Sequence, residues 1–304
     1  MSIKEHPPQL DRPIDLPVHV PVLLDSTLEV LNPKEGDSYL DLTVGYGGHA
    51  RRILEKTKNY SGSTLVDRDN FAVQSAQDLV HQGATLLETD FVSAARQLVD
   101  EGKKFDIILA DLGVSSPQLD NVERGFSFQS DGPLDMRMDR RQEQTAAMVA
   151  NSYSSEELTR IIMLYGEEPR GRAKRIAEAI VQARPVETTK QLADIVKSIG
   201  RFKGKHHPAT RTFQALRIEV NQELKLVEEV LKLLPKLLKP DGRVAIISFH
   251  SLEDRLVKRF FKEQADAGYE AELQLLTKKP IDGSIYDVHN PRSRSAKLRA
   301  AVKK

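Results

Sequence analysis

Four short apolar runs between residues 39 and 111 each end in an aspartate, and they recur at a spacing of about one strand plus one helix. These aspartates are Asp41, Asp67, Asp90 and Asp111. The rhythm predicts four parallel strands, separated by helices over residues 48–56, 70–81 and 92–101. Parallel strands bring their last residues to one edge of a sheet, and open α/β sheets bind ligands at that edge. We therefore expect an α/β fold with a ligand site beside these acids.

A glycine-rich segment follows the first acid. Gly45, Gly47 and Ala50 match the Gly-x-Gly-x-x-Ala pattern of dinucleotide-binding loops, and Asp67 lies where an acid would hold the ribose hydroxyls. A tight strand-to-helix turn without a ligand is the alternative interpretation. Asp41 favours S-adenosylmethionine over NAD, because an acid at this place can face the cationic methionine end of that cofactor.

Two further segments at this edge are candidates for ligand contact. Asp90 could meet the amino edge of an adenine and Phe91 could cover its ring, although an ordinary core aromatic explains Phe91 equally well. Asp111 opens the segment Asp-Leu-Gly-Val-Ser-Ser-Pro-Gln. A conjugated exocyclic amine is a poor nucleophile and needs acceptors for its protons, so Asp111 or Ser116-Pro117 is a candidate for catalysis. A plain Ser-Ser-Pro turn is the alternative.

The strand–helix alternation stops after a fourth strand over residues 105–111. Residues 112–139 are rich in glycine and proline and predict a long structured loop. The later elements are expected as helices over 154–165, 171–183, 189–199, 213–238 and 252–264, and as strands over 243–249, 272–277 and 296–302. Pro235 is expected to kink the longest of these helices. A helical insertion of about 90 residues thus interrupts one α/β domain.

Composition limits the chemistry of the chain. It has no cysteine, which excludes disulfides, Cys-ligated zinc, iron–sulfur clusters and a thiol nucleophile. No residues have the spacing of metal ligands, so we expect no metal site. No apolar run approaches the length of a membrane span, so no membrane contact is expected. His250 follows the fifth strand, where it would either line a substrate pocket or cap the next helix.

The formal net charge of +1 gives no global basic field, so binding of nucleic acid must depend on local patches. Residues 201–217 contain no acid and form one such patch, and residues 288–304 form another. The candidates for RNA contact in the first patch are Arg201, Lys203, Lys205 and Arg211. Solvated surface charge is the alternative for either patch alone.

Several longer motifs are more specific than the glycine–acid pattern, because together they resemble those of one family. They are DLGVSSPQLD at 111–120, ERGFSF at 123–128, DGPLDMRMD at 131–139, HPATRTFQALR at 207–217 and SFHSLEDR at 248–255. Together with the segments 20–25 and 290–295, they resemble the bacterial 16S rRNA cytosine-N4 methyltransferase family (MraW/RsmH), over about residues 19–302. The resemblance implies a class I (Rossmann-like) methyltransferase sheet with an inserted helical domain. It also implies methyl transfer from S-adenosylmethionine to the N4 amine of a cytidine in the decoding region of 16S rRNA.

The resemblance also implies site residues and domains. Its cofactor positions fall on Gly47, Gly48, His49, Asp67, Phe91, Asp111 and Gln118. The wider class of amino-methyltransferases has a second proline and an aromatic where this chain has Gln118-Leu119, so Phe126 or Phe128 is a candidate to stack on the base. We expect a flexible tail over 1–18, an S-adenosylmethionine-binding domain over 19–125 and 213–304, and an inserted substrate-recognition domain over 126–212.

The expected setting is the cytoplasm, with 16S rRNA of the small ribosomal subunit as partner. The oligomeric state is left open, with a homodimer as one option. Two rival functions remain at this point. One is an NAD-linked oxidoreductase, which only the glycine–acid pattern supports. The other is a ribosome-assembly factor that binds RNA without catalysis.

Overall fold

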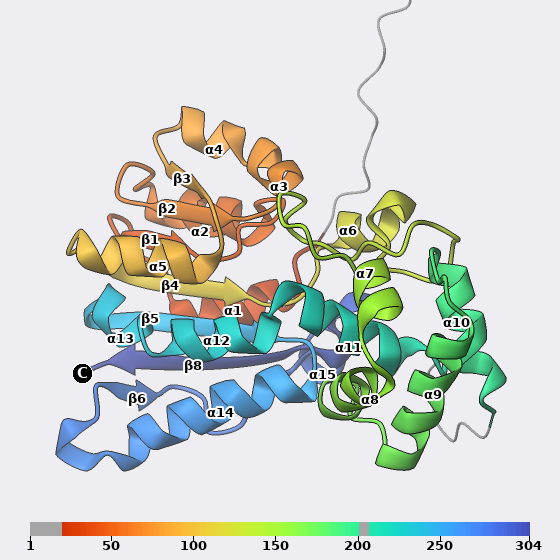
Figure 1. Cartoon of the computed structure of the whole chain (residues 1–304). Coiled ribbons are helices and arrows are strands. Elements are labelled where there is room, and N and C mark those ends of the chain that lie inside the picture. The colour runs from red at the N-terminus through yellow and green to blue at the C-terminus, as the bar shows by residue number, and fades with distance from the viewer. Residues whose placement is uncertain (1–19, 201–206) are drawn as a thin grey trace, which may run out of the picture.

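One mixed sheet organises the chain in the computed structural model, which describes residues 20–200 and 207–304 (Figure 1). Its strands are β1 (Tyr39–Asp41), β2 (Thr64–Asp67), β3 (Thr85–Glu88), β4 (Phe105–Asp111), β5 (Leu238–Ser248), β6 (Leu273–Leu275), β7 (Ile281–Asp282) and β8 (Lys297–Lys303). The order is β3-β2-β1-β4-β5-β8-β6, and β7 pairs with β8. Strands β1 to β5 run parallel, and β8 is antiparallel to its neighbours. The predicted α/β fold is confirmed.

The strand order reverses between β1 and β4, which are hydrogen-bonded neighbours. Asp41 ends β1 and Asp111 ends β4. Crevices for ligands open at such a switch point, because the connections leave it in opposite directions. Asp41 is in register with Leu109, so Asp111 lies two residues further along β4, at the edge where a site is expected.

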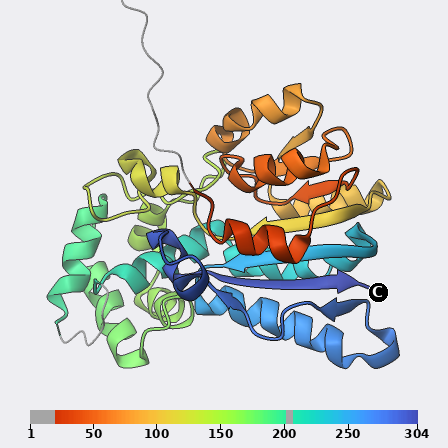
Figure 2. The same ribbon diagram turned by 180° about the vertical axis from the view of Figure 1, so that it is seen from behind.

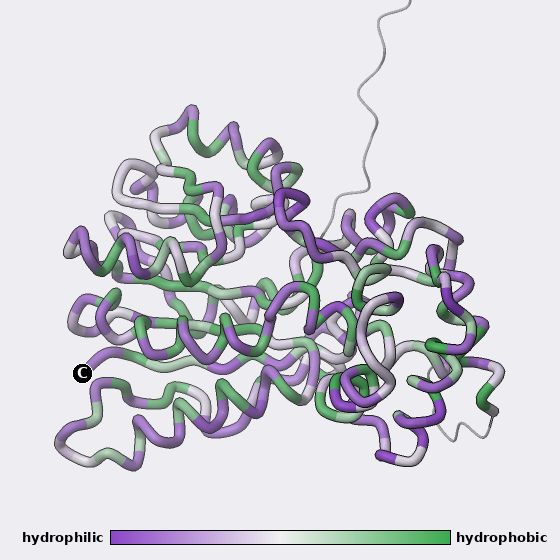
Figure 3. Tube along the Cα trace, viewed as in Figure 1, coloured by the Kyte–Doolittle hydropathy of each residue, from purple (hydrophilic) through white to green (hydrophobic). Residues whose placement is uncertain are grey.

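Helices cover both faces of the sheet (Figures 1 and 2). On one face, α5 (Phe91–Asp100), α12 (Glu223–Leu231), α13 (Leu234–Leu237) and α14 (Ser251–Asp266) share an apolar core with the strands. On the other face lie α1 (Leu24–Leu31), α2 (Gly48–Thr57), α3 (Asn70–Ser75) and α4 (Gln77–His81). Successive strand residues alternate between these cores: Ile108 packs with the first and Ile107 and Leu109 with the second. Both strand faces are thus apolar, and Figure 3 shows hydrophobic residues along the strands.

The inserted helices have a core of their own. They are α7 (Ala146–Ser152), α8 (Ser155–Leu164), α9 (Arg170–Gln182), α10 (Thr189–Ser198) and α11 (Thr210–Asn221). The predicted capping box is confirmed, because Ser154 accepts from the Glu157 backbone amide and Glu157 accepts from that of Ser154. Buried residues of α11, such as Leu216, belong to this core. We therefore propose that the return to the main domain lies nearer Gln222 than residue 213.

Three predicted elements were wrong in detail. The long helix over 213–238 is divided into α11, α12 and α13, because Gln222 takes a left-handed conformation (φ 50°) and α13 begins at Leu234 beside a proline. The helix over 70–81 is interrupted at Ala76. The loop over 112–139 contains the short helix α6 (Ser116–Asp120) and a 3-10 turn over Val122–Arg124. Helix α1, strand β7 and the short helix α15 (Gly283–Tyr286) were not predicted.

No helix in the described part of the chain is long and apolar enough to cross a membrane.

Candidate cofactor and substrate site

A cavity of about 1410 Å³ opens at the ends of the parallel strands. Its walls include the predicted residues Gly48, His49, Asp67, Phe91, Asp111, Pro117 and Gln118. Pockets for one small ligand usually measure roughly 300–1,000 Å³. This cavity therefore has room for a cofactor together with part of a second molecule, such as a nucleotide.

The glycine loop forms one wall of the cavity. Gly45 (φ 51°) has its α-carbon open to the cavity, since a Cβ there would meet nothing closer than 3.9 Å. Its backbone amide donates to Asp67 Oδ2 at 2.8 Å, so loop and acid hold each other in place. Gly47 does not line the cavity and instead lies against the side chain of Arg51. Gly48 and His49 do line it, so only part of the predicted glycine set faces a ligand.

Asp111 is an acid of the cavity wall that has an unpartnered oxygen. Its side chain is 25% exposed, and its Oδ1 is buried without a hydrogen-bond partner among the described residues. Oδ2 lies 3.5 Å from His49 Nδ1, and His49 Nε2 lies 3.0 Å from the Val22 carbonyl oxygen. Burial lowers the pKa of His49 to about 4, so the ring is neutral. Burial, with the charges of Asp41 and Glu253, raises the pKa of Asp111 well above its usual value.

Asp41 does not face the cavity, so the expected contact with a cationic ligand is wrong. Its side chain is 1% exposed and accepts from the Tyr39 hydroxyl at 2.5 Å and from the Thr43 amide at 3.0 Å. Burial raises the pKa of Asp41 to about 7. Asp41 therefore acts on the site only through the electrostatic field that it imposes on Asp111.

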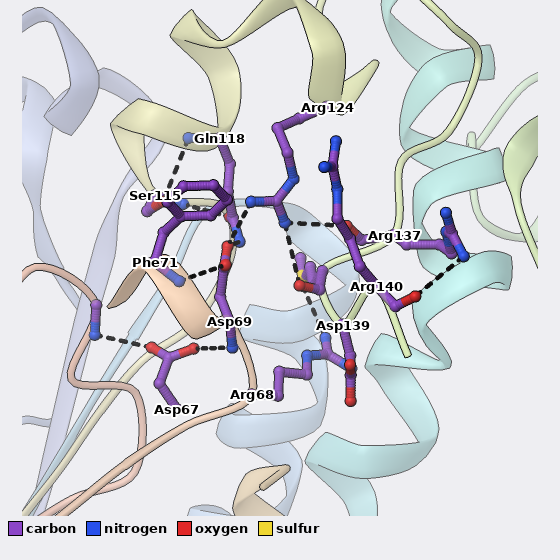
Figure 4. A network of polar contacts seen from close by, with 12 residues as sticks. Asp67, Arg68, Asp69, Phe71, Ser115, Gln118, Arg124, Arg137, Asp139 and Arg140 are labelled. Carbon is purple, nitrogen blue, oxygen red and sulfur yellow. Dashed lines mark hydrogen bonds and ion pairs between the residues drawn. The ribbon is translucent and has the colours of Figure 1, made fainter. Parts of the chain in front are cut away.

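Asp67 belongs to a network that joins the cofactor wall to the reaction loop (Figure 4). Its Oδ1 accepts from the Asp69 amide at 2.9 Å. Asp69 Oδ2 then accepts from Gln118 Nε2 at 2.7 Å and from Arg124 Nη1 at 2.9 Å. Arg124 is 3% exposed and also donates to the carbonyl oxygens of Arg137 and Met138. The placement of Gln118 beside the cavity thus depends on a buried ion pair that the sequence did not reveal.

Asp90 and Phe91 differ in their relation to the cavity. Asp90 is the N-cap of α5, and its oxygens accept from the Val92 amide and from the amide and hydroxyl of Ser93. Asp90 does not line the cavity, so the predicted contact with adenine is wrong for its carboxylate. Phe91 does line the cavity and also packs partly against the core.

The reaction loop after β4 begins α6. Ser115 caps this helix, and Gln118 Oε1 accepts from the Ser115 amide at 2.9 Å. Pro117 lines the cavity in the first turn. Ser116 is the first residue of α6, and its side chain lies outside the described part of the structure.

The aromatics proposed to stack on the base lie elsewhere. Phe126 is 7% exposed in the core of the insertion. Phe128 packs between His207 and Phe213, with ring centroids 4.6 and 4.8 Å away. Neither lines the cavity, so the stacking prediction is wrong for both. Phe249, which follows β5, does line it and was missed, although it lies inside the quoted SFHSLEDR motif.

A polar cluster forms a second part of the cavity wall. Arg217 donates from Nε and Nη2 to the two oxygens of Glu223, at 2.9 and 2.8 Å. His250 Nε2 lies 3.2 Å from Glu253 Oε1, and His250 Nδ1 accepts from the Glu253 amide. His250 therefore both lines the cavity and caps α14, which joins the two predicted alternatives. Candidate ligand atoms of Glu223, His250 and Glu253 lie within 4.8 Å of one another, but Arg217 already binds both oxygens of Glu223.

The basic patch is only partly described. Arg201, Lys203 and Lys205 lie outside the described residues. Arg211 is 48% exposed, donates to the Glu167 carbonyl oxygen at 3.2 Å and lies 3.9 Å from Glu168 Oε2. RNA contact by these four residues stays a prediction.

The described residues fit S-adenosylmethionine. The cavity offers an acid at the end of β2, an open glycine loop, the ring of Phe91 and an unpartnered oxygen of Asp111. Asp67 is engaged by two backbone amides, but each carboxylate oxygen has a second lone pair for a hydroxyl. These features suit a ligand with a ribose, an aromatic base and a cationic centre.

Comparisons with known proteins identify relatives of this chain. "Ribosomal RNA small subunit methyltransferase H" of Cyanothece sp. is 48% identical over 286 residues, covering 93% of this chain and 94% of that protein. The protein of the same name from Acidobacterium capsulatum is 46% identical over 300 residues, covering 94% of this chain and 98% of that protein. The crystal structure of an rRNA methylase from Streptococcus thermophilus covers 97% of this chain and 99% of that chain, at a TM-score of 0.40 and 11% identity. That structural likeness is too distant to support a functional argument.

The family comparison is decisive. The model of the MraW methylase family matches residues 17–304, which include every cavity residue named above. The match confirms the family expected from the motifs, and with it S-adenosylmethionine as the methyl donor. The chain belongs to the MraW methylase family.

Proposed function

We propose that this protein transfers a methyl group from S-adenosylmethionine to the N4 amine of a cytidine in the decoding region of small-subunit rRNA, in the cytoplasm. The names of its relatives support small-subunit rRNA as the substrate. The motifs quoted above support cytidine N4 as the target atom. The observation that carries the proposal is the Asp111 carboxylate, which lines a cavity with room for two ligands and has one oxygen without a partner among the described residues.

The cofactor would be held by the first part of the wall. The loop at Gly45 and the acid Asp67 would receive the ribose and its neighbourhood, Phe91 would cover the adenine, and Gln118 would close the pocket from the reaction loop. When bound, S-adenosylmethionine supplies an activated methyl group on a sulfonium. The NAD alternative loses its support, because the match to a methylase family explains the glycine–acid pattern.

The chain's own contribution is to orient the amine. The lone pair of the cytosine N4 is delocalised into the ring, so the nitrogen attacks only when its protons are drawn to acceptors and its lone pair is turned out of the ring plane. The Asp111 carboxylate is such an acceptor, because it lines the cavity, its side chain is 25% exposed and its Oδ1 has no partner in the described part of the chain. The chain contains no cysteine, so a covalent thiolate adduct to the base is excluded. Positioning is therefore the main catalytic effect of these residues.

The proposal is tested by incubating the protein with labelled methyl donor and small ribosomal subunits, digesting the rRNA and identifying the modified nucleoside by mass fragmentation. We expect N4-methylcytidine, and a label on a ring carbon or ribose would contradict the mechanism. Asp111→Ala and Ser116→Ala should reduce turnover more than they reduce RNA affinity. Asp194→Ala, on the exposed surface of α10, serves as the matched control. RNA binding without any transfer by the wild type would instead favour an assembly factor.

A further inference from the structure

Arg217 presents unused hydrogen-bond donors to the cavity. An arginine has five N–H groups, and here Nε and Nη2 each donate to Glu223. The Nη1 group has no partner among the described residues, and Arg217, 16% exposed, lines the cavity. The Glu223 carboxylate fixes the plane of the guanidinium through two parallel bonds, so the direction of the free N–H groups is also fixed.

The charges around Arg217 decide which ligand its free donors suit. Glu223 cancels the charge of Arg217. Burial by itself would raise the pKa of the nearby Glu253. The hydrogen bond from His250 and the charges of His250 and Arg217 outweigh burial and lower this pKa, so Glu253 is ionised. The cluster of Arg217, His250, Glu223 and Glu253 carries no net positive charge, because its two acids balance its two basic residues. No net positive charge attracts a phosphate or carboxylate here, whereas the free N–H groups of Arg217 suit a neutral carbonyl oxygen or ring nitrogen.

We propose that Arg217 binds the acceptor edge of the target base, the O2 and N3 atoms of cytosine, while Asp111 accepts the protons of its amine. This inference rests on the proposed function. Cytosine carries one donor group beside two acceptors, and the cavity offers an unpartnered acceptor at Asp111 and unpartnered donors at Arg217. Asp111 is in register with Ile247 of β5, three residues before His250. Ligand atoms of His250, Glu253 and Glu223 lie within 4.8 Å of one another, and Glu223 is bonded to Arg217, so Asp111 and Arg217 belong to the same end of the cavity.

The assignment explains how the site could select its base. Uracil and guanine carry a carbonyl oxygen where cytosine carries its amine. The Asp111 carboxylate would then face another acceptor oxygen and would disfavour these bases. Adenine carries an amine and a neighbouring ring acceptor but no carbonyl, and would leave one donor of Arg217 unpaired. Sites that hydrogen-bond a polar group reject analogues without it strongly, because the buried partner is then left unsatisfied. Arg217 is thus assigned as a residue that determines specificity against adenine.

The test uses Arg217→Lys, which keeps a cation for Glu223 but replaces the fixed fork by a single flexible ammonium. A double variant, Arg217→Met with Glu223→Met, removes the pair without leaving a buried charge. Arg96→Met is the matched control, because Arg96 makes an exposed ion pair with Glu229. Each variant is assayed on small subunits that carry cytidine or, through a mutated rRNA, adenosine at the target position. Cofactor affinity by calorimetry, thermal stability and the salt dependence of RNA binding are measured in parallel.

We expect Arg217→Lys to lower kcat/KM on cytidine roughly tenfold to a hundredfold and to narrow the preference for cytidine over adenosine, with cofactor affinity unchanged. The double variant should repeat both effects. An unchanged preference, or a loss of cofactor affinity, would overturn the inference. A flatter salt dependence with an unchanged preference would assign Arg217 to a phosphate instead. If the wild type modifies a nucleoside other than cytidine, the proposed function itself fails, and this result is seen before any variant is compared.

Discussion

Replacing Arg124 by methionine should destabilise the protein strongly, because it leaves a buried carboxylate without its ion partner. Arg124 is 3% and Asp69 6% exposed, and their nitrogen and oxygen atoms are 2.9 Å apart. Breaking a buried pair of this kind from one side costs roughly 3–5 kcal/mol. Two carbonyl oxygens, those of Arg137 and Met138, lose a donor at the same time. For a chain of 304 residues, the loss corresponds to a fall of roughly 5–8 °C in Tm.

The effect should reach the cofactor site through Asp69. This carboxylate still accepts from Gln118 Nε2 and from the Phe71 amide in the variant, but it no longer has a charge partner. We expect the free energy of unfolding in urea to fall by the amount above. Cofactor affinity, measured well below the transition temperature, should fall less, since Asp67 keeps its bond from Gly45.

A second variant decides whether the ion pair itself carries the effect. In Asp69→Asn combined with Arg124→Met, no buried charge is left, so much of the lost stability should return. Arg52→Met, which removes an exposed ion pair with Glu55, should change stability by less than about 1 kcal/mol. If Arg124→Met costs no more than this control, the buried network is not a structural link and the reasoning is refuted.

Two further predictions concern ligands. Asp67→Ala should weaken cofactor binding by roughly 1–3 kcal/mol, because two ribose hydroxyls lose a charged acceptor, and calorimetry on the folded variant checks this. Lys205→Ala combined with Arg211→Ala should weaken RNA binding and flatten its dependence on salt while cofactor affinity stays the same. A salt slope equal to that of the wild type would show that these charges face solvent rather than phosphate.

Elements with local signals could be predicted from the sequence. The expected strand over 105–111 coincides with β4, and the capping box at Ser154 begins α8. Both signals lie within a few residues of sequence. The signal for β4 is an apolar run, and the signal for α8 is a serine three positions before a glutamate. The break at Gln222 had no such signal, because left-handed backbone is usual for glycine and not for glutamine. Apolar periodicity continues through that break, so the pattern alone predicts one helix.

The site was predicted in part for the same reason. Asp67, Phe91 and Asp111 follow strands whose ends must meet, so their nearness follows from topology. The pair of Asp69 and Arg124 is separated by 55 positions and forms where the loop after β4 folds back onto the start of α3. In the sequence, Arg217 was only the last residue of the acid-free patch over 201–217, whose expected role was contact with RNA. Only its contact with Glu223 shows that this arginine is neutralised and faces the cavity.

The last prediction concerns the protons that Asp41 and Asp111, at the switch point of the sheet, release when a ligand binds. In the free protein, burial raises the pKa of Asp41 to about 7 and that of Asp111 well above its usual value. A cationic ligand favours the charged form of nearby carboxyls, so binding of the sulfonium should release protons, whereas the neutral thioether product should not. Affinity for S-adenosylmethionine should therefore rise with pH between about 5 and 7, at most about tenfold per unit for each proton released. Titration calorimetry in buffers of different ionisation enthalpy counts those protons, and an equal count for both ligands would refute this coupling.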